Sequence, residues 1–134
     1  MGTISQWLNR AINTLILRKV NRGDFAERKA EKFLYSKGLK ILHRNFLTKG
    51  GEIDLVMSDG NEWVFIEVRY KQSDEWADPA ESITKQKQQK IIKTAQQYLL
   101  KFDQAGKRTC RFDVILMSGD INSPQIEWIQ HAFY

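Results

Sequence analysis

Residues 50–71, GGEIDLVMSDGNEWVFIEVRYK, predict a β-hairpin. Two runs rich in β-branched and aromatic residues, 52–57 and 63–70, flank the segment SDGN at 58–61. Gly and Asn between two such runs are the residues that tight hairpin turns favour. We therefore expect two antiparallel strands joined by a short turn. The alternation along each strand then assigns every side chain to one of two faces.

A turn centred between Asp59 and Gly60 would gather apolar side chains of both strands on one face, which must then belong to the core. These residues are Ile53, Leu55, Val64, Ile66 and Val68. Asp54, facing Phe65, and Glu67, one diagonal step away, fall on the opposite face. The other residues on that face are apolar: Val56, Trp63 and Phe65. We therefore expect the two carboxyl groups to lie close together and to be largely covered.

Two carboxylates side by side in a poorly hydrated pocket need a neutralising partner, because burial and mutual repulsion both oppose their charge. One such partner is Mg²⁺, which binds one or two carboxylates and keeps positions for water and phosphate. The other is an internal ion pair with Arg69, Lys71 or a lysine of a helix. The spacing of the acids leaves both interpretations open.

The rest of the chain predicts two helices and three more strands around this hairpin. An apolar stripe with helical spacing begins after Asp24, a suitable N-cap, and ends at Gly38. A second helix is expected over 81–101, after a polar loop at 72–80. The further strands are expected at 39–46, 111–117 and 126–133. This order predicts a single α/β domain over residues 21–134, with a central mixed sheet flanked by helices.

Residues 1–20 predict an amphipathic helical arm in front of that domain. Apolar residues recur there at helical spacing, and basic residues lie between them. No apolar run reaches the length of a membrane span, so we expect no transmembrane segment. An arm of this kind packs on its own domain, on a second subunit or on a membrane surface; the sequence leaves these alternatives open.

The composition excludes several classes of protein. The 134 residues are 42% hydrophobic and 28% charged, with only two prolines, which excludes a disordered chain or a fibrous repeat. The net charge of +5 points to an anionic partner such as nucleic acid. The one cysteine, Cys110, forms no internal disulfide, so we expect a buried structural thiol and a reducing, cytoplasmic location.

Several blocks of the sequence resemble a known family. An acid followed thirteen residues later by Glu-x-basic on an apolar strand is similar to the motif of the PD-(D/E)XK nuclease superfamily. The chain as a whole resembles the YraN-like family of small bacterial proteins. The blocks, within about 23–133, are AERKAEKFLYSKGLKILHRNF, GGEIDLV, FIEVRYK, the lysine-rich helix around Lys87, RFDVI and IQHAF. The resemblance implies a restriction-endonuclease-like fold, similar to that of Holliday-junction resolvases.

The resemblance also implies a metal-dependent nuclease that acts on DNA, including branched or flap structures. Asp54 and Glu67 match the acids that bind Mg²⁺ or Mn²⁺ in that superfamily, and Glu27 matches the helical glutamate that supplements the site in junction resolvases. The lysine of the motif falls at Arg69, and Lys71 follows two residues later. Arginine stabilises phosphate charge but stays protonated. We list all four strand residues as candidate catalytic groups: Asp54, Glu67, Arg69 and Lys71.

Two further expectations concern partners. Lys87, Lys90 and Lys93 give the second helix a basic surface that suits DNA phosphates, although a solvated helix face has the same composition. Tyr70 and Trp76 flank the loop after the motif strand and suit stacking on bases, and core or lid packing is the alternative. A nucleic-acid-binding module with a degenerate nuclease site is the alternative function. Resolvase-like folds that cut two strands often dimerise, so the resemblance implies a homodimer.

Overall fold

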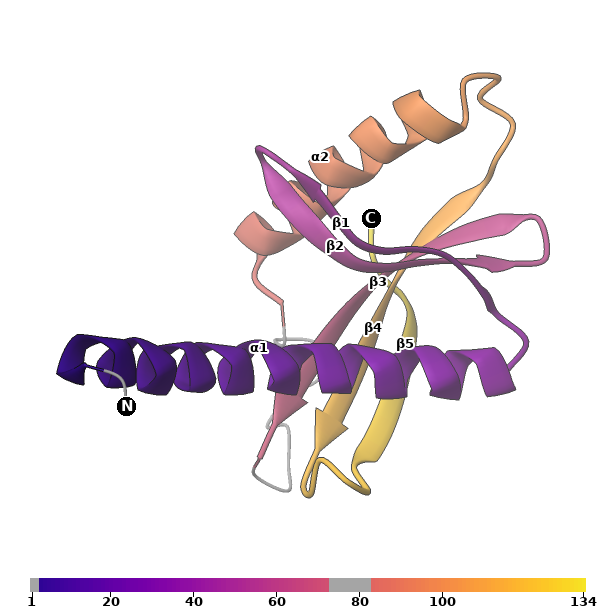
Figure 1. Cartoon of the computed structure of the whole chain (residues 1–134). Helices are drawn as coiled ribbons and strands as arrows, with labels where there is room; N and C mark the ends of the chain where they lie inside the picture. Colours follow the sequence, from indigo (N-terminus) through magenta and orange to yellow (C-terminus); the bar gives the residue numbers. More distant parts are fainter. Residues whose placement is uncertain (1–2, 73–82) are drawn as a thin grey trace.

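The protein forms a five-stranded mixed sheet with one helix packed on each face (Figure 1). The computed structural model describes residues 3–72 and 83–134, and among these the side chains of all except residues 7–22. In chain order the elements are α1 (Ile4–Ser36), β1 (Lys40–Thr48), β2 (Gly51–Asp59), β3 (Glu62–Lys71), α2 (Lys85–Phe102), β4 (Cys110–Ser118) and β5 (Gln125–Phe133).

The strands lie in the sheet in the order in which they occur in the chain. β3 and β4 are parallel, and the other neighbouring pairs are antiparallel. α2 connects the two parallel strands, as a crossover between parallel strands requires. The predicted single α/β domain with a mixed sheet and flanking helices is confirmed. None of the helices in the described part of the chain is long and apolar enough to cross a bilayer.

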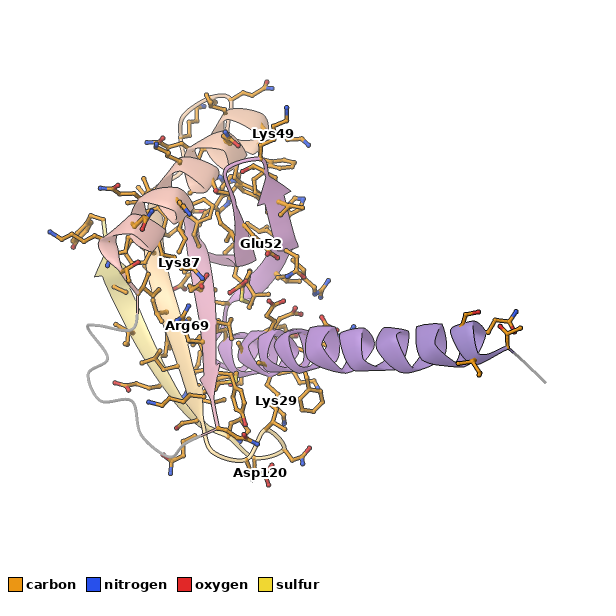
Figure 2. The ribbon with its side chains drawn as sticks, turned by 90° about the vertical axis from the view of Figure 1, so that its left-hand side faces the viewer. Lys29, Lys49, Glu52, Arg69, Lys87 and Asp120 are labelled. Atoms are coloured by element: carbon orange, nitrogen blue, oxygen red, sulfur yellow. The ribbon has the colours of Figure 1, made fainter. Side chains whose placement is uncertain are left out.

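α1 is one continuous helix, whereas the sequence predicted a break before Asp24. That N-cap assignment is wrong, because Asp24 lies inside α1 and pairs with Arg28 at 3.2 Å. The helix starts instead after Thr3, whose hydroxyl accepts from the Gln6 N–H while the Gln6 side chain accepts from the Thr3 N–H. Gly23 inside a helix costs only about 1 kcal/mol, which is too little to end it. The first half of α1 projects beyond the sheet (Figures 1 and 2).

Each face of the sheet carries its own apolar core. α1 covers one face through Ala26, Ala30 and Leu34. The sheet residues beneath it are Leu55, Met57, Val64, Ile66, Ile115 and Met117. α2 covers the other face through Ile91, Ala95 and Tyr98. The sheet residues in that second core include Val56, Phe65, Val114 and Leu116. The alternation predicted for the hairpin therefore holds along its paired part, since neighbouring residues of β2 and β3 enter different cores.

The hairpin register differs from the predicted one by two residues. Asp59 pairs with Glu62, so the turn is centred between Gly60 and Asn61. Gly60 takes a φ of 61° at the first position of that two-residue turn, where only glycine is unstrained. Because the displacement is even, the side chains in the paired part of the hairpin keep their predicted faces. Its effect is to move Asp54 away from Phe65 and opposite Glu67.

Ile53 is the exception to the predicted faces. It was expected in the core with Leu55 and Ile66, but it packs in the other cluster, with Phe65 and Ile91 of α2. The paired register of β2 and β3 ends at Leu55, and the preceding residues of β2 pair with β1 alone. This part of β2 forms a two-stranded ribbon with β1 that twists toward α2 (Figure 1), because a two-stranded ribbon twists more strongly than a wide sheet.

A buried arginine joins the far end of the hairpin to β4 and β5. Arg111 is 6% exposed and contacts three carboxylates, those of Asp59, Glu62 and Asp113, at 2.8–3.1 Å. Asp113 is fully buried and also accepts from the Trp128 ring N–H. The sequence pattern did not predict this network, although Arg111 and Asp113 lie in the block RFDVI. Cys110 next to it is exposed, so the expected buried thiol is wrong.

Candidate active site

Asp54 and Glu67 meet where β2 separates from β3. The paired register ends at Leu55 and Ile66, and the two acids are the next residues on their strands. Asp54 Oδ2 accepts a 2.8 Å hydrogen bond from the Val68 N–H. The Asp54 carboxylate thus accepts the hydrogen bond of a backbone N–H at the point where the backbone pairing of β2 and β3 ends. We call this point, formed by Asp54, Glu67 and Val68, the fork.

A pocket of about 360 Å³ lies beside the fork and is bordered by the start of α2. Its walls are Gly51, Glu52, Asp54 and Glu67 from the strands and Thr84, Gln86, Lys87, Lys90 and Ile91 from the helix side. A Cβ on Gly51 would lie only 2.9 Å from Thr94 Oγ1. Glycine at this position therefore allows α2 to lie close to β2. The first turns of the helix border the acids as a result.

Glu67 has a cationic partner in this pocket. Its side chain is 6% exposed, and its Oε1 lies 2.8 Å from Lys87 Nζ and 3.9 Å from Arg69 Nη1. Lys87 comes from α2 and Arg69 from β3, and both lie on the side of the molecule shown in Figure 2. Of the two interpretations of the acid pair, an ion pair with a helix lysine holds for Glu67.

Asp54 has no such partner among the described side chains, since none of the ion pairs found there includes it. The pKa of Asp54 is raised from 3.8 to about 8, first by burial and then by the negative charge of Glu67, against the opposing hydrogen bond from the Val68 N–H. The Asp54 carboxyl therefore holds a proton at neutral pH. A bound cation would replace that proton, because it supplies the missing opposite charge.

Two more acids border the fork. Glu27 of α1 is half-buried, and burial raises its pKa, while hydrogen bonds from Asn45 and with Asp54 lower it. The Asn45 side-chain amide donates to Glu27 Oε2 at 2.7 Å and to Glu52 Oε1 at 3.2 Å. Asn45 has a φ of 51°, a conformation that asparagine tolerates better than most residues. The sequence analysis missed Asn45, and nothing in its local pattern distinguishes it from a surface asparagine.

The acids fit a divalent cation by charge and ligand type. Carboxylate oxygens are the ligands that Mg²⁺ prefers, and this ion is commonly held by one or two of them together with water and phosphate. Asp54 and Glu67 supply two such groups in one pocket, and Glu27 lies within hydrogen-bonding range of Asp54. Within residues 3–72 and 83–134, no three acidic, histidine or cysteine side chains already stand together as a metal site. The fit thus rests on the pair of acids and on the lack of a cationic partner for Asp54 among the described side chains.

The other predicted site residues lie at different distances from the pocket. Lys90 borders it, whereas Lys93 is exposed one turn further along α2. Lys71 ends β3 and does not border it. Tyr70 packs beneath α1, and its hydroxyl donates to the Gly119 carbonyl at 2.6 Å, so the alternative of core packing holds for it. Trp76 lies outside the described residues.

Comparison with known proteins places the chain in a family. A model of the uncharacterised protein family UPF0102 matches residues 26–117. The chain belongs to this family. A UPF0102 protein of Hahella chejuensis is 45% identical over 119 residues, which are 88% of this chain and 94% of that protein. UPF0102 proteins of Pseudomonas fluorescens and Saccharophagus degradans are 42% and 45% identical over 111 residues, 83% of this chain and 91% of each relative.

The UPF0102 match includes the fork and both helices that border it. Residues 26–117 span Glu27, Asp54, Glu67 and Lys87, together with most of β4. The first 25 residues, with the projecting half of α1, lie outside the family model. The acidic pocket therefore belongs to the part of the chain that defines UPF0102 membership.

Proposed function

We propose that this UPF0102 protein is a metal-dependent nuclease that hydrolyses phosphodiester bonds in DNA. The observation that carries the proposal is the shared pocket of Asp54 and Glu67, in which the Asp54 carboxyl has no opposing charge. The resemblance to the PD-(D/E)XK superfamily supports it, because the two acids lie on adjacent antiparallel strands at the centre of a mixed sheet. We infer a restriction-endonuclease-like fold on the same grounds.

Asp54 and Glu67 would hold Mg²⁺ or Mn²⁺, with Glu27 as a further ligand. Bound there, the ion would polarise the phosphate and lower the pKa of a water molecule. The Val68 N–H fixes one oxygen of Asp54 at 2.8 Å, which leaves the other oxygen of that carboxylate for the ion. The cationic groups of Lys87 and Arg69 lie beside Glu67, on the side from which a phosphate would be attracted.

The surface around the pocket suits a DNA backbone. Lys90 borders the pocket and Lys93 is exposed on the same helix, so both are available to phosphates. Contacts of lysines with phosphates position a protein on DNA and carry no information on base sequence. This supports a structure-selective substrate, such as branched or flap DNA, which the resemblance to junction resolvases also implies. A homodimer that cuts two strands is part of this proposal.

The test is cleavage of duplex, single-stranded, flap and four-way DNA with Mg²⁺ or Mn²⁺ by the whole chain. We expect product with at least one substrate, and a loss of about 100-fold or more for Glu67→Gln, because the variant removes a charged metal ligand. Glu127→Gln is the matched control, since Glu127 is exposed on β5 and remote from the fork. Equal cleavage by Glu67→Gln and the wild-type protein would contradict the proposal.

A second function is favoured by the cations around Glu67. Lys87 already neutralises this acid, and Arg69 stands where the superfamily motif has lysine. A DNA-binding module with a degenerate site would have these properties. It would bind DNA in a salt-sensitive manner and give no metal-dependent product with any of the four substrates.

A further inference from the structure

Lys87 occupies a fixed position in the first turn of α2. Its backbone N–H donates to Thr84 Oγ1 at 3.2 Å, and Thr84 is the N-cap of the helix. The Gln88 N–H donates to the Thr84 carbonyl at 2.9 Å in the same turn. An N-cap stabilises the helix start, because it satisfies a backbone N–H that has no partner within the helix. The Lys87 side chain leaves this capped turn and reaches Glu67 across the pocket.

Arg69 is less well placed for the same acid. Its Nη1 lies 3.9 Å from Glu67 Oε1, beyond hydrogen-bonding distance, whereas Lys87 Nζ lies 2.8 Å from the same oxygen. A lysine ammonium is a compact charge on a flexible stem that can turn between two anionic partners. Of the two cations beside Glu67, Lys87 thus makes the closer contact, and it borders the pocket while Arg69 does not.

We propose that Lys87 of α2, and not Arg69 of the motif strand, supplies the catalytic cation of the pocket. This inference rests on the proposed nuclease function. The Lys87 ammonium, now paired with Glu67, would contact a non-bridging oxygen of the bound phosphate and stabilise the negative charge that develops there. In the superfamily motif this cation is a lysine of the strand, whereas here it would be a lysine of the facing helix α2.

The reaction balances without any proton transfer by Lys87. The oxygen of a water molecule forms a new bond to phosphorus, and the bond from phosphorus to the leaving deoxyribose oxygen breaks with its electron pair. One water proton goes to the solvent, and the leaving oxygen takes a proton from the solvent. Lys87 remains an ammonium ion throughout, so a positive charge at this position is what the step requires.

The test compares three variants and one control variant of the full chain with the wild-type protein in Mn²⁺-dependent cleavage at saturating DNA. We expect Lys87→Gln to lower the cleavage rate by about 100-fold and Lys87→Arg to restore a large part of it. Arg69→Gln should lower the rate by less than about fivefold. Lys85→Gln is the matched control, because Lys85 is exposed two residues earlier and does not border the pocket. Thermal melting of each variant verifies that it is folded.

A second measurement does not depend on cleavage. Because the Lys87 ammonium competes with a metal ion for Glu67 Oε1, Lys87→Gln should bind Mn²⁺ about fivefold more tightly in calorimetric titration, while Lys85→Gln is unchanged. Cleavage by Lys87→Gln at the wild-type rate, or unchanged Mn²⁺ affinity, would overturn this assignment and leave the nuclease proposal standing. A wild-type protein that cleaves no substrate would overturn the nuclease proposal itself, and the role of Lys87 with it.

Discussion

The Val68 backbone N–H donates a 2.8 Å hydrogen bond to Asp54 Oδ2 at the point where β2 leaves β3. One carboxylate oxygen thus replaces a strand partner, and the same side chain faces an acidic pocket. Asp54 is therefore both a structural acceptor and an ionisable group without a cationic partner among the described side chains. Substitutions that keep the acceptor and remove the charge separate these two properties.

Asp54→Asn should change how stability depends on pH. The pKa of Asp54 is raised from 3.8 to about 8 in the fold, chiefly by burial, so the folded chain keeps a proton that the unfolded chain releases. The free energy of unfolding should then fall as the pH rises from about 4 to about 8. Asparagine keeps an oxygen for the Val68 N–H, so at pH 8 the variant should be about 2–4 kcal/mol more stable than the wild-type protein without metal.

Urea unfolding from pH 4 to pH 9 in chelator measures this difference. The stability curves of the two proteins should approach each other as the pH falls toward 4, because the Asp54 carboxyl of the unfolded wild-type chain then also begins to bind a proton. Added Mn²⁺ should stabilise the wild-type protein at pH 8 by mass action and should have a smaller effect on Asp54→Asn. Parallel stability curves for the two proteins would show that Asp54 is charged in the fold.

Asn45→Gly should weaken metal binding while leaving the fold intact. Glycine accepts the φ of 51° without strain, but it removes the amide that donates to Glu27 and Glu52. Loss of a group that orients ligands lowers metal affinity by about tenfold or more. Mn²⁺ titration measures the effect, and Asn61→Gly at the hairpin turn is the control. Unchanged affinity would mean that Glu27 and Glu52 do not support the site.

Arg111→Leu should be strongly destabilising. Asp59 and Glu62 of the hairpin and Asp113 of β4 share this buried guanidinium, and its removal leaves Asp113 fully buried without its cationic partner. Removing one partner of a buried ion pair costs about 3–5 kcal/mol. Arg44→Ala is the comparison, because the Arg44–Glu31 pair is more than half exposed on the arginine side and contributes about 0–1 kcal/mol. Chemical denaturation of both variants measures the contrast.

Gly51→Ala should displace α2 from β2. The new Cβ would lie 2.9 Å from Thr94 Oγ1, so we expect a loss of about 1–3 kcal/mol. Gly50→Ala is the control, since its Cβ would meet only Thr48 Oγ1, at 4.0 Å. Thr94→Ala removes the obstructing oxygen, so the double variant should lose less than the sum of the single variants. Strict additivity would argue against a steric contact between the two positions.

The sequence predicted most of the sheet and the shared face of the acids. The alternation of residues 52–57 and 63–70 was sufficient for this, because an even change of register leaves every face unchanged. The turn position was wrong by two residues, since SDGN offers glycine to more than one two-residue turn. Ile53 packs in the other core because β2 twists beyond its last pair with β3. The alternation of apolar and polar residues does not indicate such a twist.

Long-range partners could not be predicted in the same way. From the sequence, the partner of the acids could be a metal ion, a cation of the same strand or a lysine of a helix. The close packing of α2 on β2 at Gly51 brings Lys87 to Glu67. Asn45 and Arg111 contact residues far away in the chain, Glu27 and Asp59. The periodic alternation of apolar and polar residues, from which helices and strands are predicted, contains no information on such contacts. The start of α1 was obscured by Asp24, a good N-cap residue that forms an i,i+4 pair in the helix instead.

The continuity of α1 has a mechanical consequence. Its first half extends past the sheet (Figure 1), while its second half carries Glu27 to the fork and is anchored by Ala26, Ala30 and Leu34. Because the helix is unbroken, a tilt of its extended half about this anchor would move Glu27 relative to Asp54, to which Glu27 is hydrogen-bonded.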